Sequence, residues 1–276
     1  YLGAIKNWVN LQNDYDSIFV IVDMHSITVK QNPAELRKRC LSFAAQFLAS
    51  GVNPKKSSIF IQSHVPQHAE LSWVLNCYSY MGELNRMTQY KDKIKNINKN
   101  INVGLFTYPI LMASDILLYQ ANLVPVGSDQ KQHLELARDL ANRFNNQYSQ
   151  TFTIPKPYIP KVGARIMSLL EPNTKMSKSD KNDNNIISIL DKPDIVCKKI
   201  KKAVTDSEST IRYDDERLGL KNLINIYSIL TKKTINKIES DYDGKGYKEF
   251  KDDLSQIIND TLNPIQKEYY KIIKNK

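Results

Sequence analysis

Short apolar runs alternate with stretches of helical periodicity over the first part of the chain. Residues 17–22 form a continuous apolar run, which predicts a strand buried on both faces, as in a parallel sheet. Asn32 and Pro33 then supply a cap and a first-turn proline for a helix that Gly51 ends. Residues 58–62 predict a second short buried strand. This order indicates a βαβ unit with a right-handed crossover.

A helix over residues 69–80 and a third strand at residues 123–126 continue the pattern. The strand breaks at Gly127 and leads into a helical pattern over residues 133–144. In doubly wound sheets, ligands lie at the carboxyl ends of the strands, where a helix N-terminus offers unpaired N–H groups. Gly127 and Asp129 are therefore candidate nucleotide contacts. The alternative is an ordinary turn that needs a glycine and an N-cap.

The last third of the chain has a different pattern of apolar positions, because helical periodicity dominates it. Helices are predicted over residues 195–204, 220–230 and 250–262. The lysine-rich face of the first of them either meets RNA phosphates or is simply solvated. We therefore predict an α/β domain at residues 1–185 and a smaller helical domain at residues 186–276.

Composition and charge narrow the class of protein. The 276 residues are 41% hydrophobic, enough for a substantial core, and 39 Lys and Arg against 29 Asp and Glu give a net charge of +10, which favours polyanionic partners. Cys40, Cys77 and Cys197 are odd in number and widely spaced, so neither a disulfide framework nor a zinc site is indicated. No run approaches the ~18 apolar residues of a membrane span. The sequence predicts a cytoplasmic protein.

One loop carries the most specific chemistry. Residues 175–179 read Lys-Met-Ser-Lys-Ser, and two lysines three residues apart on a turn-prone stretch suit a polyphosphate. The flanks lack the apolar periodicity that would fix the loop in a core, so we expect it to be flexible and solvated. The alternative is an ordinary charged surface loop.

Asp115 stands out in a mostly apolar stretch at residues 110–119. A lone acid in such surroundings must either find hydrogen-bond partners or raise its pKa. It is therefore a candidate for binding a polar group of a ligand. The alternatives are a helix cap and a purely structural hydrogen bond.

Residues 175–179 are identical to the KMSKS motif of class I aminoacyl-tRNA synthetases, and the chain resembles the bacterial-type tryptophanyl-tRNA synthetases. The resemblance extends over nearly the whole chain. Its other motifs are at residues 22–28, 108–117, 124–130 and 159–169.

The resemblance implies a Rossmann-like parallel-sheet catalytic domain and a two-step reaction. ATP and L-tryptophan give tryptophanyl-adenylate and pyrophosphate, and the aminoacyl group then moves to tRNA(Trp). Lys175 and Lys178 would neutralise the departing pyrophosphate, with Mg²⁺ sharing the charge. The family also implies a homodimer.

Site residues carry over from the resemblance position by position. Those implied for ATP are Gly127, Ser128, Asp129, Ile166, Lys175, Met176, Ser177, Lys178 and Ser179. Lys91 and Lys93 match a segment near the phosphates, and the alternative for both is solvent exposure.

For tryptophan, the resemblance implies that Asp115 accepts the indole N–H. The walls would be Met112, Ile116, Val124 and Val126, and His25, Tyr108 and Gln130 would line the rest of the pocket. Gln130 would meet the ammonium or carboxylate group. We treat His25 as a pocket wall and give no catalytic role to His64, His68 and His133.

The chain departs from the family pattern in three ways, and two alternative functions remain open. The family's HIGH-type turn is expected before Tyr1, further helices are expected after residue 276, and Ser128 replaces an acid usual in its motif. A tyrosyl-tRNA synthetase shares similar motifs, but Met112 and Val124 would offer a phenol hydroxyl no polar partner. A non-catalytic tRNA-binding paralogue is the alternative outside the enzymes.

Overall fold

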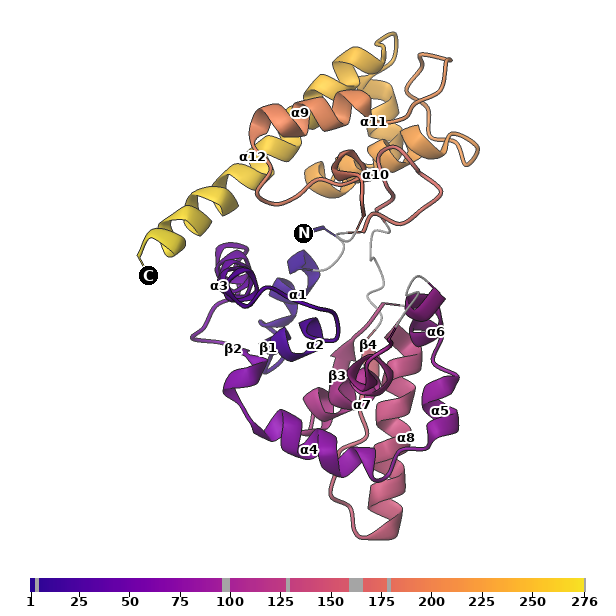
Figure 1. Ribbon diagram of the computed structural model, residues 1–276. Coiled ribbons are helices and arrows are strands. Elements are labelled where there is room, and N and C mark those ends of the chain that lie inside the picture. Colours follow the sequence, from indigo (N-terminus) through magenta and orange to yellow (C-terminus); the bar gives the residue numbers. More distant parts are fainter. Residues whose placement is uncertain (3–4, 96–99, 128–129, 159–165, 178–179, 276) are drawn as a thin grey trace. The chain divides into compact units, whose positions relative to one another are not determined.

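The chain divides into two compact units in the computed structural model, which describes residues 1–276 except 3–4, 96–99, 128–129, 159–165, 178–179 and 276 (Figure 1). Unit 1 comprises Tyr1–Tyr15, Ala45–Asn53 and Val162–Lys276, and unit 2 comprises Asp16–Ala44 and Pro54–Lys161. Unit 1 therefore combines early segments of the chain with its last part. The functional boundary between residues 185 and 186 stays a prediction.

Unit 2 holds the parallel strands and most of the helices around them. Its elements are β1 (Ile18–Ile21), α2 (Asp23–Ser26), the first part of α3 (Pro33–Ala49), β2 (Ser58–Ile61), η1 (Gln62–His64), α4 (Gln67–Asn76), α5 (Met81–Asn85), α6 (Thr88–Lys95), α7 (Val103–Leu117), β3 (Leu123–Pro125), α8 (Lys131–Gln147) and β4 (Lys156–Tyr158).

The predicted strand–helix–strand unit is confirmed in order and direction. β1 and β2 pair in parallel, from Ile18 opposite Ser58 to Ile21 opposite Ile61. The predicted cap of α3 forms, because the Asn32 side chain accepts a hydrogen bond from the Glu35 N–H at 3.2 Å. The handedness of the crossover stays a prediction.

The expectation that the first strand is buried on both faces is wrong for one face. Ile18 is 41% exposed and Val22, just after the strand, is 44% exposed, whereas Phe19 and Ile21 are buried. Among the described strands, β1 pairs only with β2. The face that carries Ile18, Val20 and Val22 is only partly buried, because residues two apart on a strand share a face.

A second parallel pair, β3 with β4, lies in the same unit as a helical core. α7 packs against both α4 and α8, and their apolar side chains form one buried cluster that includes Leu75, Ile110 and Leu134. β4 was not predicted, because Pro157 lies at its centre and a proline cannot donate to a strand partner.

Unit 1 is built mainly from helices, as predicted for the last third of the chain. Its elements are α1 (Ile5–Leu11), η3 (Asp183–Asn185), α9 (Pro193–Lys202), α10 (Leu218–Thr231), α11 (Ile235–Asp241) and α12 (Tyr247–Lys274). Lys199 departs from the predicted solvated face of α9, because its side chain is buried and pairs with Asp191 at 2.6 Å. In the ranges that the structure describes, no helix has the length and apolar character to cross a membrane.

Gly219 marks a close approach of α10 to the preceding loop. A Cβ atom at this position would lie 2.2 Å from the backbone oxygen of Val204. Gly219→Ala is therefore expected to lower the free energy of unfolding by about 1–3 kcal/mol, the usual cost of overpacking. Urea denaturation measures this change. Gly82→Ala is the matched control, since its Cβ would meet only the Arg86 side chain at 3.7 Å; equal stability of both variants would contradict the prediction.

Candidate active site

Asp115 lies on α7 at the centre of a hydrogen-bond cluster in unit 2. Its Oδ1 accepts hydrogen bonds from Gln62 Nε2 at 2.7 Å and from His68 Nδ1 at 2.6 Å. Its Oδ2 lies 2.9 Å from His25 Nε2. The carboxylate is mostly buried, with 12% of the side chain exposed. Distant parts of the chain thus supply the partners that a buried charge requires.

The partners of Asp115 are themselves held in place. The Gln62 amide oxygen accepts a hydrogen bond from the Met24 backbone N–H at 3.2 Å, and His68 Nε2 lies 2.8 Å from the Tyr119 hydroxyl. Gln62 and His68 are both fully buried. The carboxylate is therefore oriented by a network that reaches α2, η1, α4 and the turn after α7.

Sequence analysis missed Gln62, His68 and Tyr119 as partners of the acid. Two signals point to them in retrospect. Gln62 follows directly on β2, at the carboxyl end of a parallel strand where ligands gather, and Tyr119 is four residues after Asp115, on the same side of a helical turn. His68 has no such local signal, because only the packing of α4 on α7 brings it to the carboxylate.

The predicted walls of the tryptophan pocket lie near this acid in the chain and in unit 2. Met112 and Ile116 flank Asp115 on α7, with Ile116 7% exposed. Val124 on β3 is half-buried, and Val126, just after it, is 6% exposed. All four belong to the buried cluster of unit 2 or pack against it. The structure thus places them in one apolar region, and their contact with a ligand stays a prediction.

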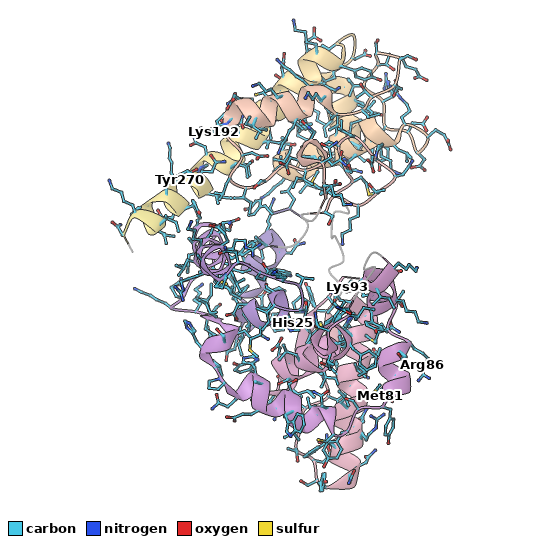
Figure 2. All side chains as sticks on the ribbon, viewed as in Figure 1. His25, Met81, Arg86, Lys93, Lys192 and Tyr270 are labelled. Atoms are coloured by element: carbon cyan, nitrogen blue, oxygen red, sulfur yellow. The ribbon has the colours of Figure 1, made fainter. Side chains whose placement is uncertain are left out.

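The ring of Tyr108 contacts both His25 and Lys93, which are labelled in Figure 2. The Lys93 ammonium lies 4.0 Å from the centre of the Tyr108 ring, and the His25 ring lies edge-on to it at 6.3 Å. The Tyr108 hydroxyl is 2.9 Å from His133 Nε2, and burial raises the pKa of Tyr108 to about 12. Desolvation lowers the pKa of Lys93. The two lysines proposed as phosphate contacts are both exposed, and the ammonium of Lys93 lies over the ring of Tyr108, one of the predicted pocket residues.

The turn before α8 is described only in part. Gly127 is exposed, and its backbone oxygen accepts a hydrogen bond from the N–H of Gln130 at 3.0 Å. Gln130 is the residue that precedes α8. Ser128 and Asp129 lie outside the described residues. The predicted turn between β3 and α8 is therefore confirmed in its place, and its nucleotide contacts stay a prediction.

The lysine loop is attached to unit 1 at its first residues. Met167 and Lys175 form an antiparallel bridge, and the Met176 N–H donates to the Ile166 oxygen at 3.0 Å. Met176 and Ile166 pack against the helical core of unit 1, while Lys175 and Ser177 are exposed. The expectation that nothing apolar fixes the loop is thus wrong at Met176. Lys178 and Ser179 lie outside the described residues.

Two polar side chains hold the stretches on either side of this loop. The buried Asn222 of α10 donates from its amide to the Met167 oxygen at 2.8 Å and accepts from the Met167 N–H at 2.9 Å. After the loop, Asp180 accepts hydrogen bonds from the Asn182 N–H and the Asn185 side chain, which hold its pKa below the usual range. Neither anchor was predicted, because both depend on tertiary contacts or turn geometry.

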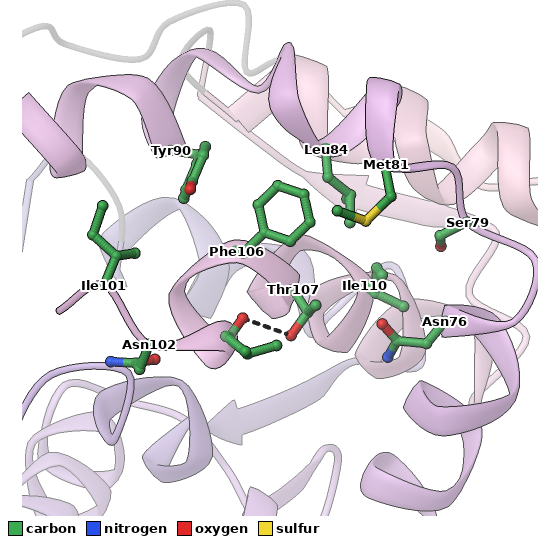
Figure 3. Close-up of a pocket in the computed structure, with 11 residues that line it drawn as sticks. Asn76, Ser79, Met81, Leu84, Tyr90, Ile101, Asn102, Phe106, Thr107 and Ile110 are labelled. Carbon is green, nitrogen blue, oxygen red and sulfur yellow. Dashed lines mark hydrogen bonds between the residues drawn. The ribbon is translucent and has the colours of Figure 1, made fainter.

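A separate pocket of about 350 Å³ lies along α7 near α4 and α5 (Figure 3). Its lining includes Phe106 and Ile110, and none of the predicted tryptophan contacts is among its residues. Its polar side chains bond to the chain itself: Thr107 Oγ1 donates to the Val103 oxygen at 3.1 Å, and Asn102 caps α7. We therefore assign no substrate to this pocket.

Known proteins resemble this chain over most or all of its length. A family model for class I tRNA synthetases (W and Y) matches residues 1–263. The tryptophan--tRNA ligase of Clostridium perfringens is 57% identical over 276 residues, covering 100% of this chain and 83% of the relative. The crystal structure of the Mycoplasma pneumoniae tryptophanyl-tRNA synthetase is 37% identical with a TM-score of 0.89, over 98% of this chain and 83% of that one.

A further solved relative carries ligands. The Campylobacter jejuni tryptophanyl-tRNA synthetase, in complex with ADP and tryptophan, is 33% identical with a TM-score of 0.86, over 99% of this chain and 84% of that one. These likenesses confirm the predicted α/β, Rossmann-like fold. The chain therefore belongs to the class I tRNA synthetase family of the tryptophan and tyrosine enzymes, among its bacterial tryptophan-type members.

Proposed function

We infer that this protein activates L-tryptophan with ATP and transfers it to tRNA(Trp). The relatives that match over the whole chain bear the name of that ligase activity. The structural observation that carries the assignment is the mostly buried Asp115 carboxylate, held by three side chains beside an apolar region. Such a carboxylate is suited to an indole, whose one polar group is a hydrogen-bond donor.

The proposed chemistry depends on position and charge. The tryptophan carboxylate attacks the α-phosphorus of ATP, and pyrophosphate leaves, so the site must align the reactants and stabilise the leaving charge. Lys175 is exposed at the anchored start of the lysine loop, where a long cationic side chain can follow the phosphates. We assign the same task to Lys178, and a contact with adenosine to Met176 and Ile166.

The tyrosine alternative fits the pocket less well. A phenol hydroxyl both donates and accepts, whereas a carboxylate only accepts. The residues expected around it, Met112, Val124 and Val126, are apolar. The identity of 53–57% to tryptophan--tRNA ligases over essentially the whole chain also favours the tryptophan assignment over a non-catalytic paralogue.

Further partners follow from the proposed activity. We propose that Mg²⁺ arrives with ATP, because Mg²⁺ is commonly held by substrate phosphates with few protein ligands. A cytoplasmic location fits a protein that must meet tRNA and ATP. Homodimer formation is proposed from the family resemblance, and sedimentation of the full-length protein would test it.

Exchange of labelled pyrophosphate into ATP tests the function directly. The full-length protein is expected to catalyse this exchange with tryptophan and not with tyrosine, because only the indole offers a lone donor to Asp115. Exchange with tyrosine and none with tryptophan would overturn the assignment. Exchange with neither amino acid would favour the tRNA-binding paralogue.

A further inference from the structure

Three rings of unit 2 lie together next to Asp115, one of them the ring of its partner His68. His68 of α4 lies 5.4 Å from the ring of Tyr119 and 6.0 Å from that of Phe60 on β2. The ring of Phe60 is also 5.7 Å from that of Tyr119. His68 is fully buried, so its two ring nitrogens depend on Asp115 and Tyr119 for partners.

The hydrogen-bond roles in this chain of groups follow from the chemistry of its ends. An ionised carboxylate only accepts, so His68 Nδ1 carries a proton toward Asp115 Oδ1. The Tyr119 hydroxyl then donates to His68 Nε2. Burial and the nearby charge of Asp115 raise the pKa of Tyr119, which keeps its hydroxyl protonated. In this arrangement the Tyr119 hydroxyl occupies Nε2, and Nδ1 is the nitrogen that donates to Asp115.

As a result, the two oxygens of the Asp115 carboxylate accept different numbers of hydrogen bonds. Each carboxylate oxygen accepts about two hydrogen bonds. In the part of the chain that the structure describes, Gln62 and His68 fill Oδ1, whereas Oδ2 has only His25 as a partner. With respect to these described residues, one acceptor direction therefore remains on Oδ2.

We propose that Tyr119 and His68 are positioning residues that set the selection of the indole N–H. Tyr119 holds the His68 ring, and His68 holds Asp115 Oδ1. The carboxylate therefore cannot turn, and the remaining acceptor direction on Oδ2 is presented to the substrate. This inference rests on the proposed function, since it concerns how the same pocket selects its amino acid.

The test compares tryptophan with 3-(benzothiophen-3-yl)alanine, in which sulfur replaces the indole N–H. The measured quantity is the ratio of kcat/KM for tryptophan to kcat/KM for this analogue in pyrophosphate exchange. Tyr119→Phe removes only the hydroxyl that fixes His68. It is expected to lower the ratio about tenfold, close to the worth of one charge-assisted hydrogen bond, mainly through a smaller kcat/KM for tryptophan.

Two variants of His68 separate positioning from packing. The amide nitrogen of Asn can stand near the place of Nδ1, so His68→Asn is expected to keep the ratio within about threefold of the original protein. His68→Leu keeps the buried volume without a donor and is expected to lower the ratio as Tyr119→Phe does. The matched control is Tyr148→Phe, which removes a hydroxyl bonded to Tyr78 in the same unit and is expected to leave the ratio unchanged.

The outcomes distinguish this inference from the proposed function. An unchanged ratio in Tyr119→Phe, or an equal loss with both substrates, would overturn the positioning role. A ratio near one in the unaltered protein would overturn it as well, since there would be no selection to set. Absence of tryptophan-dependent exchange in the unaltered protein would instead refute the proposed function.

Discussion

Replacing Lys178 with alanine is expected to slow tryptophanyl-adenylate formation about a hundredfold or more, the scale seen when one preorganised transition-state donor is lost. The reason is that negative charge builds on the departing pyrophosphate only as the bond to the α-phosphorus breaks. An ammonium that follows this charge lowers the barrier without strengthening the binding of tryptophan. The measurement is the single-turnover rate of adenylate formation, with tryptophan affinity measured in parallel.

Lys181→Ala is the matched control for this prediction. It removes the same charge from an exposed position just after the loop. The control is expected to change the rate little, because the general positive field is screened within about 10 Å at ordinary salt. If Lys178→Ala and the control behave alike, the lysine acts through net charge, and the motif loses its specific role.

The anchoring of the loop gives this prediction a structural basis. The stretch before the loop is held to α10 by the paired hydrogen bonds of Asn222 with Met167, and Met176 packs on the helical core of unit 1. Lys175 is part of this anchored backbone, through its bridge with Met167, and is exposed. A fixed base with long cationic side chains suits a loop that closes on phosphates.

Local sequence signals predicted the elements that depend on local chemistry. The cap at Asn32 and the stop at Gly51 bound α3 as expected, and the apolar runs gave β1 and β2. β4 was not predicted because it contains Pro157. A proline has no N–H to donate and is therefore unfavourable in a strand unless no partner needs that hydrogen bond. The residues of α3, β1 and β2 themselves favour their helix or strand, whereas β4 is a strand because it pairs with β3.

The candidate site shows the same division. Asp115 could be identified from its apolar surroundings, because a buried charge is costly without partners. The identity of those partners could not, since Gln62 and His68 are 53 and 47 residues away in the chain and meet the acid only after packing. A single sequence indicates that an acid must be satisfied, and the fold decides by which side chains.

Asp115→Asn is the second change with a large expected effect. The amide keeps one oxygen, which the donors Gln62 and His68 will claim at the position of Oδ1. Its NH₂ group then stands where Oδ2 was and faces the indole N–H, donor against donor. His25 can adapt by changing its tautomer, but an indole has no acceptor to offer.

The kcat/KM for tryptophan in Asp115→Asn is therefore expected to fall about a hundredfold, which corresponds to ~3 kcal/mol for a lost charge-assisted hydrogen bond. The benzothiophene analogue, which has no N–H, is expected to lose far less. Asp139→Asn, on the exposed side of α8, is the control for the chemical change. Thermal melting checks that the variant is folded. An equal loss with both substrates would return Asp115 to a structural role, because a group that only supports the fold has no means of telling an N–H from a sulfur atom.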